Sequence, residues 1–190
     1  MRTVNKETKE KFIKAMIAEM QEHGITDFSL RRVSSRCGTT SGAPYRHFKD
    51  KNDAILEVLK YINNKWYEIQ DDIIQKYPDD YRKQLVDMCI NYISFLHEYP
   101  EFQTILMLND SSMTSEQRKE KGYVSMKAAE TVDKYCQSVN MSEQDRTRKL
   151  FIVRSLIFGG ALMLNSGVMP FCESTIEMIR ASIDREFDLE

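Results

Sequence analysis

Apolar residues recur at intervals of three and four along most of this chain, which is the spacing of one face of an α-helix. The first such stripe runs from Phe12 to Met20, and Gly24 follows as a residue suited to the turn that ends a helix. Only seven glycines and four prolines are available for turns. The pattern therefore predicts an all-α fold.

One stripe is much longer than the others. Its members stand at spacings of 4, 3, 4, 3 and 4, and they are Ile55, Leu59, Ile62, Trp66, Ile69 and Ile73. Asp50 suits the N-cap of this helix, and Asp53 suits the positive end of its dipole. We expect one helix over 50–77, about 40 Å long at about 1.5 Å per residue. A helix of that length would bridge an N-terminal domain (1–50) and a C-terminal domain (51–190).

The rest of the C-terminal part predicts further helices with polar turns between them. Gly167 and Pro170 separate the last two helices, and Asn109 to Thr114 is a polar, turn-like stretch. The expected helices cover 81–97, 100–108, 116–138, 143–166 and 174–188.

A compact pattern of short elements lies before the long helix. Ser29 can cap a short helix that contains Leu30 and Val33, and Cys37-Gly38-Thr39 provides a turn. A third short helix would carry Ala43 to His47. This order suits a three-helix domain with a helix-turn-helix, whose second helix enters the major groove of DNA.

Side chains around this turn are of the types that contact DNA. Short residues over 39–43 allow backbone and methyl contacts to bases, and arginines reach phosphates or a guanine edge. Tyr45, Arg46, His47 and Lys51 present phosphate donors at about one helical turn. The predicted DNA-contacting residues are Ser29, Arg31, Arg32, Thr39, Thr40, Ser41, Gly42, Ala43, Tyr45, Arg46, His47 and Lys51.

The fragment Gly42-x-x-Tyr45-x-His47-Phe48-x-x-Lys51 resembles the signature of TetR-type (tetracycline-repressor-like) transcriptional regulators. The resemblance is strong over residues 7–60 and only architectural beyond them. It implies phosphate contacts by Tyr45, His47 and Lys51, packing by Phe48, and a homodimer.

The chain departs from that family pattern at two places. Pro44 stands where a leucine-like residue is more common, and Thr39-Thr40 stands where Val-Ser is common. Because proline is tolerated only near a helix start, the third helix is expected to begin at Ser41. The operator sequence cannot be copied from relatives.

Charge is divided unevenly along the chain. Residues 1–66 hold 13 Lys and Arg against 8 Asp and Glu, whereas the remaining residues hold 14 against 21. A basic first third suits a nucleic-acid-binding module joined to a domain that does not touch DNA. Chance segregation of solvated charge is the alternative.

Other sequence features exclude several classes of protein. The longest nearly apolar run, Leu150 to Leu164, is too short for a membrane span and contains Arg154. No signal-peptide pattern is present, and the four cysteines are far apart, so we expect free thiols and a cytoplasmic location. Redox sensing by one of them stays open.

No constellation of catalytic residues is recognisable. The three histidines are isolated, and no metal-ligand spacing or phosphate-binding loop is present. We expect neither an enzyme nor a cofactor. Asp71-Asp72 and Asp79-Asp80 are interpreted as solvated surface, with metal binding as the alternative.

The C-terminal part is rich in methionine and aromatic residues, which suit either a solid core or an adaptable ligand cavity. Arg154, within an apolar helix, would pair with a buried acid or face an anionic ligand. The predicted cavity residues are Tyr92, Phe102, Met107, Tyr123, Met126, Arg154 and Phe158. The ligand is expected to be largely apolar.

The last two helices have more apolar surface than one partner covers. Small residues at 159–161 allow close helix approach. We expect a four-helix bundle formed by two chains. Its predicted interface residues are Ile157, Gly160, Ala161, Ile176, Ile179, Ile183 and Phe187.

Together these patterns predict a homodimeric, ligand-responsive transcriptional regulator that does not contact membranes. It would act as a repressor, released from a palindromic operator by a small molecule. Two alternatives remain: a TetR-like activator or partner-binding protein, and a helical small-molecule-binding protein or enzyme.

Overall fold

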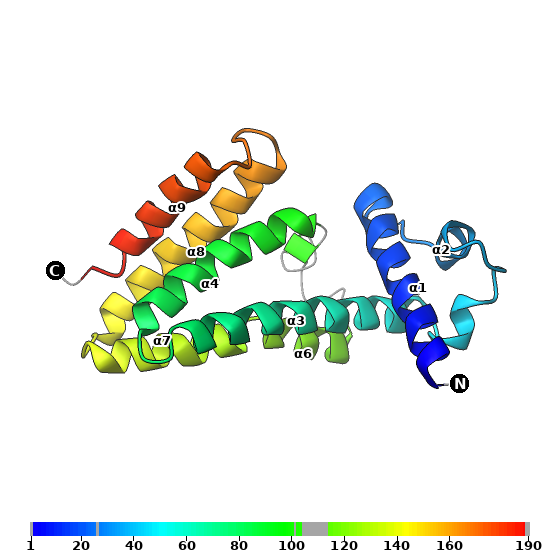
Figure 1. The fold of residues 1–190 in the computed structure, drawn as a ribbon, viewed down its shortest axis with the longest axis horizontal. Coiled ribbons are helices and arrows are strands. Elements are labelled where there is room, and N and C mark those ends of the chain that lie inside the picture. Colours follow the sequence, from blue (N-terminus) through cyan, green and yellow to red (C-terminus); the bar gives the residue numbers. More distant parts are fainter. Residues whose placement is uncertain (1, 26, 101, 104–113, 189–190) are drawn as a thin grey trace. The chain divides into compact units, whose positions relative to one another are not determined.

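A computed structural model describes residues 2–25, 27–100, 102–103 and 114–188, and all regular secondary structure in these ranges is helical (Figure 1). The α-helices are α1 (Arg2–His23), α2 (Leu30–Arg36), α3 (Lys51–Lys76), α4 (Tyr81–Glu98), α6 (Ser115–Tyr123), α7 (Met126–Ser138), α8 (Glu143–Asn165) and α9 (Glu173–Arg185). A 3-10 helix, η1, covers Pro44–Arg46. The all-α prediction is confirmed. None of these helices is long and apolar enough to cross a membrane.

The chain forms two compact units, and the first comprises Met1–Lys65 and Tyr99–Tyr123. Its core contains the predicted stripe of α1, including Phe12, Met16 and Met20, each at most 1% exposed. Val33 of α2 and Phe48 are buried in the same unit. The periodic spacing of the α1 stripe therefore identified a true core face.

A reciprocal pair of side-chain caps starts α3. The Asp53 backbone N–H donates to Asp50 Oδ1 at 2.9 Å, and the Lys49 N–H donates to Asp53 Oδ2 at 2.8 Å. These bonds satisfy N–H groups that have no partner within the helix. The predicted cap at Asp50 is confirmed. Because α3 is continuous, it supplies residues to both units. The predicted division at residue 50 stays a prediction.

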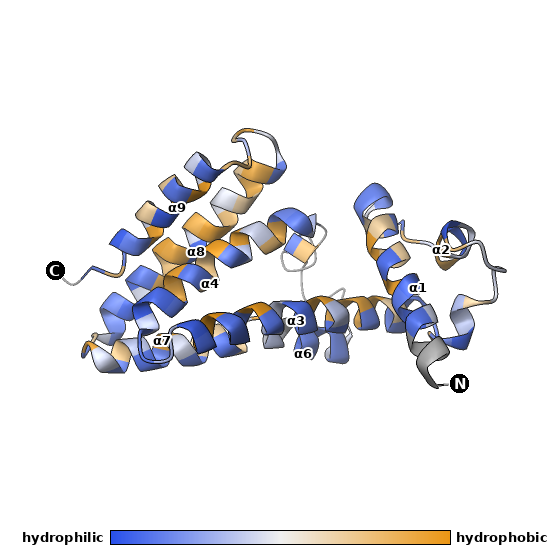
Figure 2. Ribbon diagram, viewed as in Figure 1, coloured by the Kyte–Doolittle hydropathy of each residue, from blue (hydrophilic) through white to orange (hydrophobic). Residues whose placement is uncertain are grey.

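The second unit comprises Trp66–Glu98 and Val124–Glu190, and α4 packs against α7, α8 and α9 within it. Apolar residues concentrate on α4 and α8 (Figure 2). A Cβ atom on Gly160 would lie 3.5 Å from Ile179 Cδ1 and 3.7 Å from Ile93 Cδ1. Gly160 therefore allows α8 to approach α4 and α9 closely, as the sequence predicted.

The region from 116 to 138 differs from the single helix that we expected. It forms α6 and α7, which are separated at Val124 and Ser125. The Val124 side chain is buried, and its carbonyl accepts a hydrogen bond from Trp66 Nε1 at 3.1 Å. That bond uses a carbonyl that a continuous helix would have used internally. The helix expected over 100–108 lies mostly outside the described residues.

Candidate nucleic-acid interface

The turn after α2 is closed by backbone hydrogen bonds. Gly38 has a φ of +66°, and its N–H donates to the Ser35 carbonyl at 3.1 Å. The Thr39 N–H donates to the Ser34 carbonyl at 3.0 Å. This is the Schellman arrangement, in which a left-handed residue, usually glycine, ends the helix. It directs the chain sharply into the segment predicted to contact DNA.

The expected third helix is shorter than the sequence suggested. Instead of an α-helix that starts at Ser41, the structure has a turn followed by η1 from Pro44 to Arg46. Pro44 has no N–H, and the Thr40 carbonyl instead accepts from the Ala43 N–H at 2.9 Å. A second turn then closes from the His47 N–H to the Pro44 carbonyl at 2.9 Å. Proline therefore begins the helical turn here.

The structure places the predicted DNA-contacting residues on the surface of the first unit. Tyr45 is 59% exposed, although tyrosine rings are usually at least partly covered. Ser29, Ala43 and His47 are half-buried, and the other predicted contacts are exposed. Leu30, Val33, Pro44 and Phe48 are buried and support this surface from within the unit. Their role in DNA binding stays a prediction.

Arg32 has a structural partner that the sequence analysis did not identify. Its guanidinium donates to the carboxylate of Glu19 and to the backbone carbonyl of Asp27. Glu19 is fully buried and also accepts from Arg36 Nε at 3.1 Å. These ion pairs hold α2 against α1, so the geometry assigns Arg32 a structural contact within the unit. Arg31 has no ion pair within the described ranges.

Replacing Glu19 with glutamine should lower the stability of the protein by about 1–3 kcal/mol, because two guanidiniums would lose their shared counter-charge. The partial exposure of both arginines keeps the expected loss at this level. Urea unfolding would measure it. Glu22→Gln is the matched control: Glu22 pairs with Arg36 but is exposed, so its replacement should lower the stability much less than Glu19→Gln does. Equal effects of the two substitutions would contradict this assignment.

His47 combines packing with a position at the candidate interface. Its ring centre lies 5.5 Å from that of Phe12 and 6.1 Å from that of Phe48. Partial burial lowers its pKa, and the nearby charges of Lys9 and Arg46 lower that pKa further. The ring is therefore neutral at neutral pH, and a phosphate contact by His47 would be a hydrogen bond rather than an ion pair.

Comparison with known proteins agrees with this geometry. The family model for bacterial regulatory proteins of the tetR family matches residues 12–58. Residues 12–58 thus form a domain of this family. The HTH-type transcriptional regulator YerO of Bacillus subtilis is 31% identical over 84 residues, which are 42% of this chain and 29% of that protein. The aligned part thus spans less than half the length of the curated relatives.

Solved structures resemble the chain over nearly its whole length. A TetR family regulator from Marinobacter aquaeolei VT8 has a TM-score of 0.73 at 18% identity and covers 98% of each chain. AibR, solved in complex with isovaleryl coenzyme A and operator DNA, has a TM-score of 0.70 at 13% identity. That match covers 93% of this chain and 95% of AibR. At such identities the likeness shows a shared TetR-type fold.

The predicted cavity residues lie in different surroundings. Tyr92 contacts Trp66, with ring centres 4.8 Å apart, and burial raises its pKa above the usual range. Arg154 is exposed and has no ion pair in the described part of the chain, so the expected pairing with a buried acid is absent there. Phe158 and Tyr123 are half-buried, Phe102 is buried, and Met126 is 45% exposed. Met107 lies outside the described residues.

A buried glutamine is the feature of the second unit that the sequence did not reveal. Gln70 is fully buried, and neither its amide nitrogen nor its amide oxygen has a hydrogen-bond partner within the described ranges. It lies one turn after Trp66, and the stripe was assigned to the neighbouring Ile69, which is only half-buried. An unpaired buried amide is costly, which marks Gln70 as a candidate contact for a bound molecule.

The residues predicted for the TetR-type dimer interface are covered within one chain. Ile157, Gly160, Ala161, Ile179, Ile183 and Phe187 are buried, and Ile176 is half-buried. Their face of α8 and α9 packs inside the unit, so they are not free to meet a second chain. The large apolar residues that remain exposed on these helices and their connection are Phe151, Leu162, Met163, Val168, Phe171 and Met178. These residues form the exposed apolar face.

Proposed function

We propose that this chain is a homodimeric transcriptional regulator that binds a palindromic operator and is released by a small molecule. The observation that carries the proposal is the largely exposed segment from Thr39 to Arg46, supported by buried Val33 and Phe48 and followed by Lys51 at the start of α3. An exposed tyrosine beside basic residues suits contact with a phosphate backbone.

The exposed apolar face supports association of two chains. On α8, the exposed Phe151 and Leu162 lie on one side of the helix with the half-buried Phe158 and the small residues Ser155 and Gly159. Small residues between large ones allow two helices to interdigitate. Two chains joined in this way would present two recognition segments to successive major grooves, about 34–36 Å apart.

The second unit supports an effector site. Trp66 and Tyr92 provide apolar surface, and Gln70 provides one unpaired donor and one unpaired acceptor nearby on α3. A largely apolar molecule with one amide, acid or hydroxyl group would match both features. The ligand named for AibR, an acyl thioester of coenzyme A, has an amide-containing arm and an apolar acyl chain, so this class belongs in a screen.

The continuity of α3 supports coupling between effector and DNA. Gln70 and Lys51 belong to the same uninterrupted helix, so a displacement of its second half can move its first turn. A change of five- to 150-fold in operator affinity requires only about 1–3 kcal/mol of difference in effector affinity between the two states. Thermal-shift screening of acyl thioesters and amphipathic amides, followed by operator release, tests the proposal. Binding without a change in operator affinity would contradict the coupling.

Replacing Gln70 with methionine should stabilise the ligand-free protein by about 1 kcal/mol, because it removes an unpaired buried amide while keeping the volume. The same substitution should weaken effector binding. Urea unfolding would measure the stability. Gln84→Met is the matched control, since Gln84 is also buried but donates to the Tyr77 carbonyl at 2.5 Å, and its loss should be destabilising. Destabilisation by both substitutions would contradict the role assigned to Gln70.

A further inference from the structure

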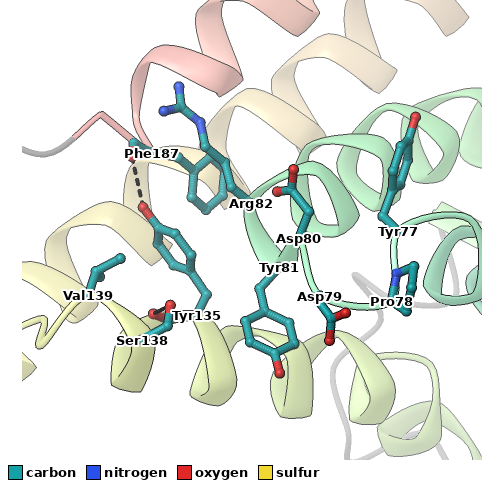
Figure 3. Close-up of a pocket in the computed structure, with 10 residues that line it drawn as sticks. All are labelled: Tyr77, Pro78, Asp79, Asp80, Tyr81, Arg82, Tyr135, Ser138, Val139 and Phe187. Carbon is teal, nitrogen blue, oxygen red and sulfur yellow. Dashed lines mark hydrogen bonds between the residues drawn. The ribbon is translucent and has the colours of Figure 1, made fainter.

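An open pocket of about 620 Å³ lies in the second unit, away from every residue that we assign to DNA or effector binding. Three segments line it: the turn from α3 into α4, the end of α7, and the residues after α9 (Figure 3). The lining residues include three tyrosines, Tyr77, Tyr81 and Tyr135, and the acidic residue Asp79. Aromatic rings beside a carboxylate form a surface that attracts organic cations.

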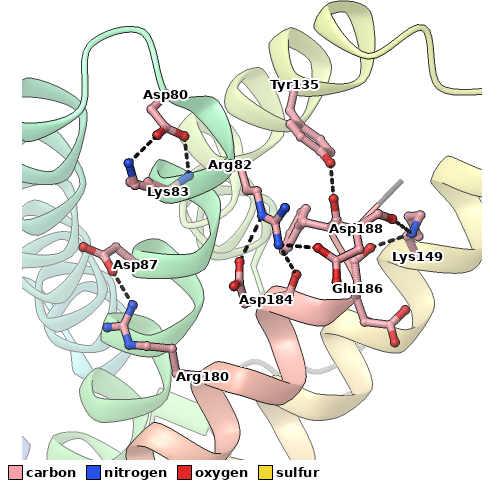
Figure 4. Close-up of polar contacts among 11 residues, drawn as sticks. Asp80, Arg82, Lys83, Asp87, Tyr135, Lys149, Arg180, Asp184, Glu186 and Asp188 are labelled. Atoms are coloured by element: carbon pink, nitrogen blue, oxygen red, sulfur yellow. Dashed lines mark hydrogen bonds and ion pairs between the residues drawn. The ribbon is translucent and has the colours of Figure 1, made fainter. Parts of the chain in front are cut away.

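The wall formed by the C-terminal residues is held by several hydrogen bonds. The Tyr135 hydroxyl donates to the Phe187 carbonyl at 2.7 Å. Lys149 Nζ donates to the Glu186 carbonyl at 2.6 Å and to the Asp188 carbonyl at 3.2 Å (Figure 4). These bonds join α7 and α8 to the segment after α9. The pocket therefore has a fixed wall in the ligand-free protein.

The one arginine that lines the pocket is already neutralised. Arg82 Nε donates to Asp184 Oδ1 at 3.0 Å, and its Nη2 donates to Asp188 Oδ1 at 2.6 Å and to the Asp184 carbonyl at 3.0 Å (Figure 4). Two carboxylates thus surround a single guanidinium. An anionic molecule would find no available counter-charge there, and it would meet the two aspartates instead.

The two aspartates of the turn differ in their partners. Asp80 pairs with Lys83 Nζ at 2.8 Å, and this contact lowers the pKa of Asp80. Asp79 lines the pocket, and no ion pair involves it in the described part of the chain. The charge left available to a ligand is therefore the negative charge of Asp79.

The tyrosines also differ in what covers them. Tyr77 already accepts an ammonium, since Lys76 Nζ lies 4.7 Å from its ring centre. Tyr135 packs edge-on against Phe187, with ring centres 5.4 Å apart. Tyr81 is half-buried, and no cation lies over its ring within the described ranges. Tyr81 and Asp79 are thus the pair best placed to receive an external cation.

We propose that this pocket binds small organic cations that carry an aromatic or apolar body, such as aryl ammonium compounds. The ammonium would lie near Asp79 and against the face of Tyr81, and the apolar body would contact the remaining rings. This site is separate from the proposed effector site, because none of its lining residues belongs to that set. It would provide a second ligand input to the same unit.

The test is an NMR titration of the full-length protein with three probes of similar size: phenyltrimethylammonium, benzyl alcohol and benzenesulfonate. We expect saturable binding of the ammonium compound only, with shifts concentrated at residues 77–82 and 135–139. Asp79→Asn and Tyr81→Leu should each weaken binding about fivefold. Asp72→Asn removes the same charge from an exposed position of α3 outside the pocket, and it should change binding less than about twofold.

Several results would overturn the proposal. These are the absence of saturable binding by the ammonium compound, equal binding of the neutral alcohol, stronger binding of the sulfonate, and equal weakening by Asp79→Asn and Asp72→Asn. Thermal unfolding of each variant, which should match the parent protein, separates lost binding from lost folding. Failure here leaves operator binding untouched, since no probe or substitution involves the DNA-contacting residues.

Discussion

Replacing Lys51 or Tyr45 with alanine is expected to reduce operator affinity at least tenfold at about 0.15 M salt while leaving the protein folded. Tyr45 is 59% exposed, so its removal takes little packing from the core. Lys51 is exposed at the start of α3, with its Nζ 5.9 Å from the centre of the Phe28 ring. We expect both side chains to contact phosphates of the DNA backbone.

The salt dependence of binding distinguishes a lost phosphate contact from a general weakening. Each Lys51→Ala dimer loses two contacts, so the slope of log affinity against log salt should fall by about two. Lys134→Ala is the control, because Lys134 is an exposed lysine of α7 in the second unit. Fluorescence anisotropy over a salt series would measure the three variants and the parent protein. If Tyr45→Ala and Lys51→Ala both keep the operator affinity and the salt slope of the parent protein, these side chains do not contact the DNA backbone.

Replacing Leu162 with glutamate is expected to convert a dimer into folded monomers. Leu162 is 58% exposed in the single chain, so the substitution should be tolerated within the protomer. At a dimer interface the same carboxylate would be buried without a partner, and the dimer dissociation constant should rise about 100-fold or more. Operator affinity should fall with it, since a monomer meets only one half-site.

Sedimentation would measure the change, with the parent protein at twice the 22.3 kDa chain mass. Met126→Glu is the control, because Met126 is an exposed apolar residue of α7 outside the exposed apolar face. Ile183→Glu provides the contrast. Ile183 is fully buried within one chain, so its substitution should lower the stability of the protomer itself. A Leu162→Glu protein that remains dimeric would place the interface elsewhere.

Local signals in the sequence predicted the fold well. The α1 stripe and the Asp50 cap depend on residues within one or two turns of each other, and both are present in the structure. Gly38, which ends α2 with a positive φ, was also predictable from its neighbours, because glycine favours the left-handed conformation in such a turn. These features need no knowledge of distant contacts.

In the segment from Thr39 to Arg46, the restriction that proline places on a helix conflicts with the helix expected from the family pattern. Pro44 was expected to fit in the first turn of a helix that begins at Ser41, but a proline there cannot donate to the Thr40 carbonyl. The structure resolves the conflict by starting η1 at Pro44. The departure from the family pattern therefore had a larger local effect than the sequence analysis assigned to it.

Helical periodicity could not show which face of α8 packs within one chain and which face is available to a second chain. This helix is apolar on several sides, so spacing identifies buried faces without saying which chain buries them. The face with Ile157 and Ala161 packs inside the unit, whereas Phe151 and Leu162 remain exposed. Only the tertiary packing of α4 and α9 separates these faces.

Contacts that depend on residues far apart in the sequence could not be predicted either. Glu19 lies next to the apolar stripe of α1, and only the fold brings Arg32 and Arg36 to it. Gln70 is adjacent to Ile69, and a rotation of one residue along the helix decides which of them is buried. In both cases a polar residue within an apolar stretch was the available signal.

Two copies of this chain are expected to bind one operator. Mass photometry of the purified protein with the DNA upstream of its own coding sequence tests it most directly, with a shuffled duplex as the control. We expect a complex of two chains per operator site, or a multiple of two, formed by the upstream DNA and absent from the shuffled duplex at physiological salt. Equal binding to both duplexes, or a saturated complex of one chain per site, would contradict the account.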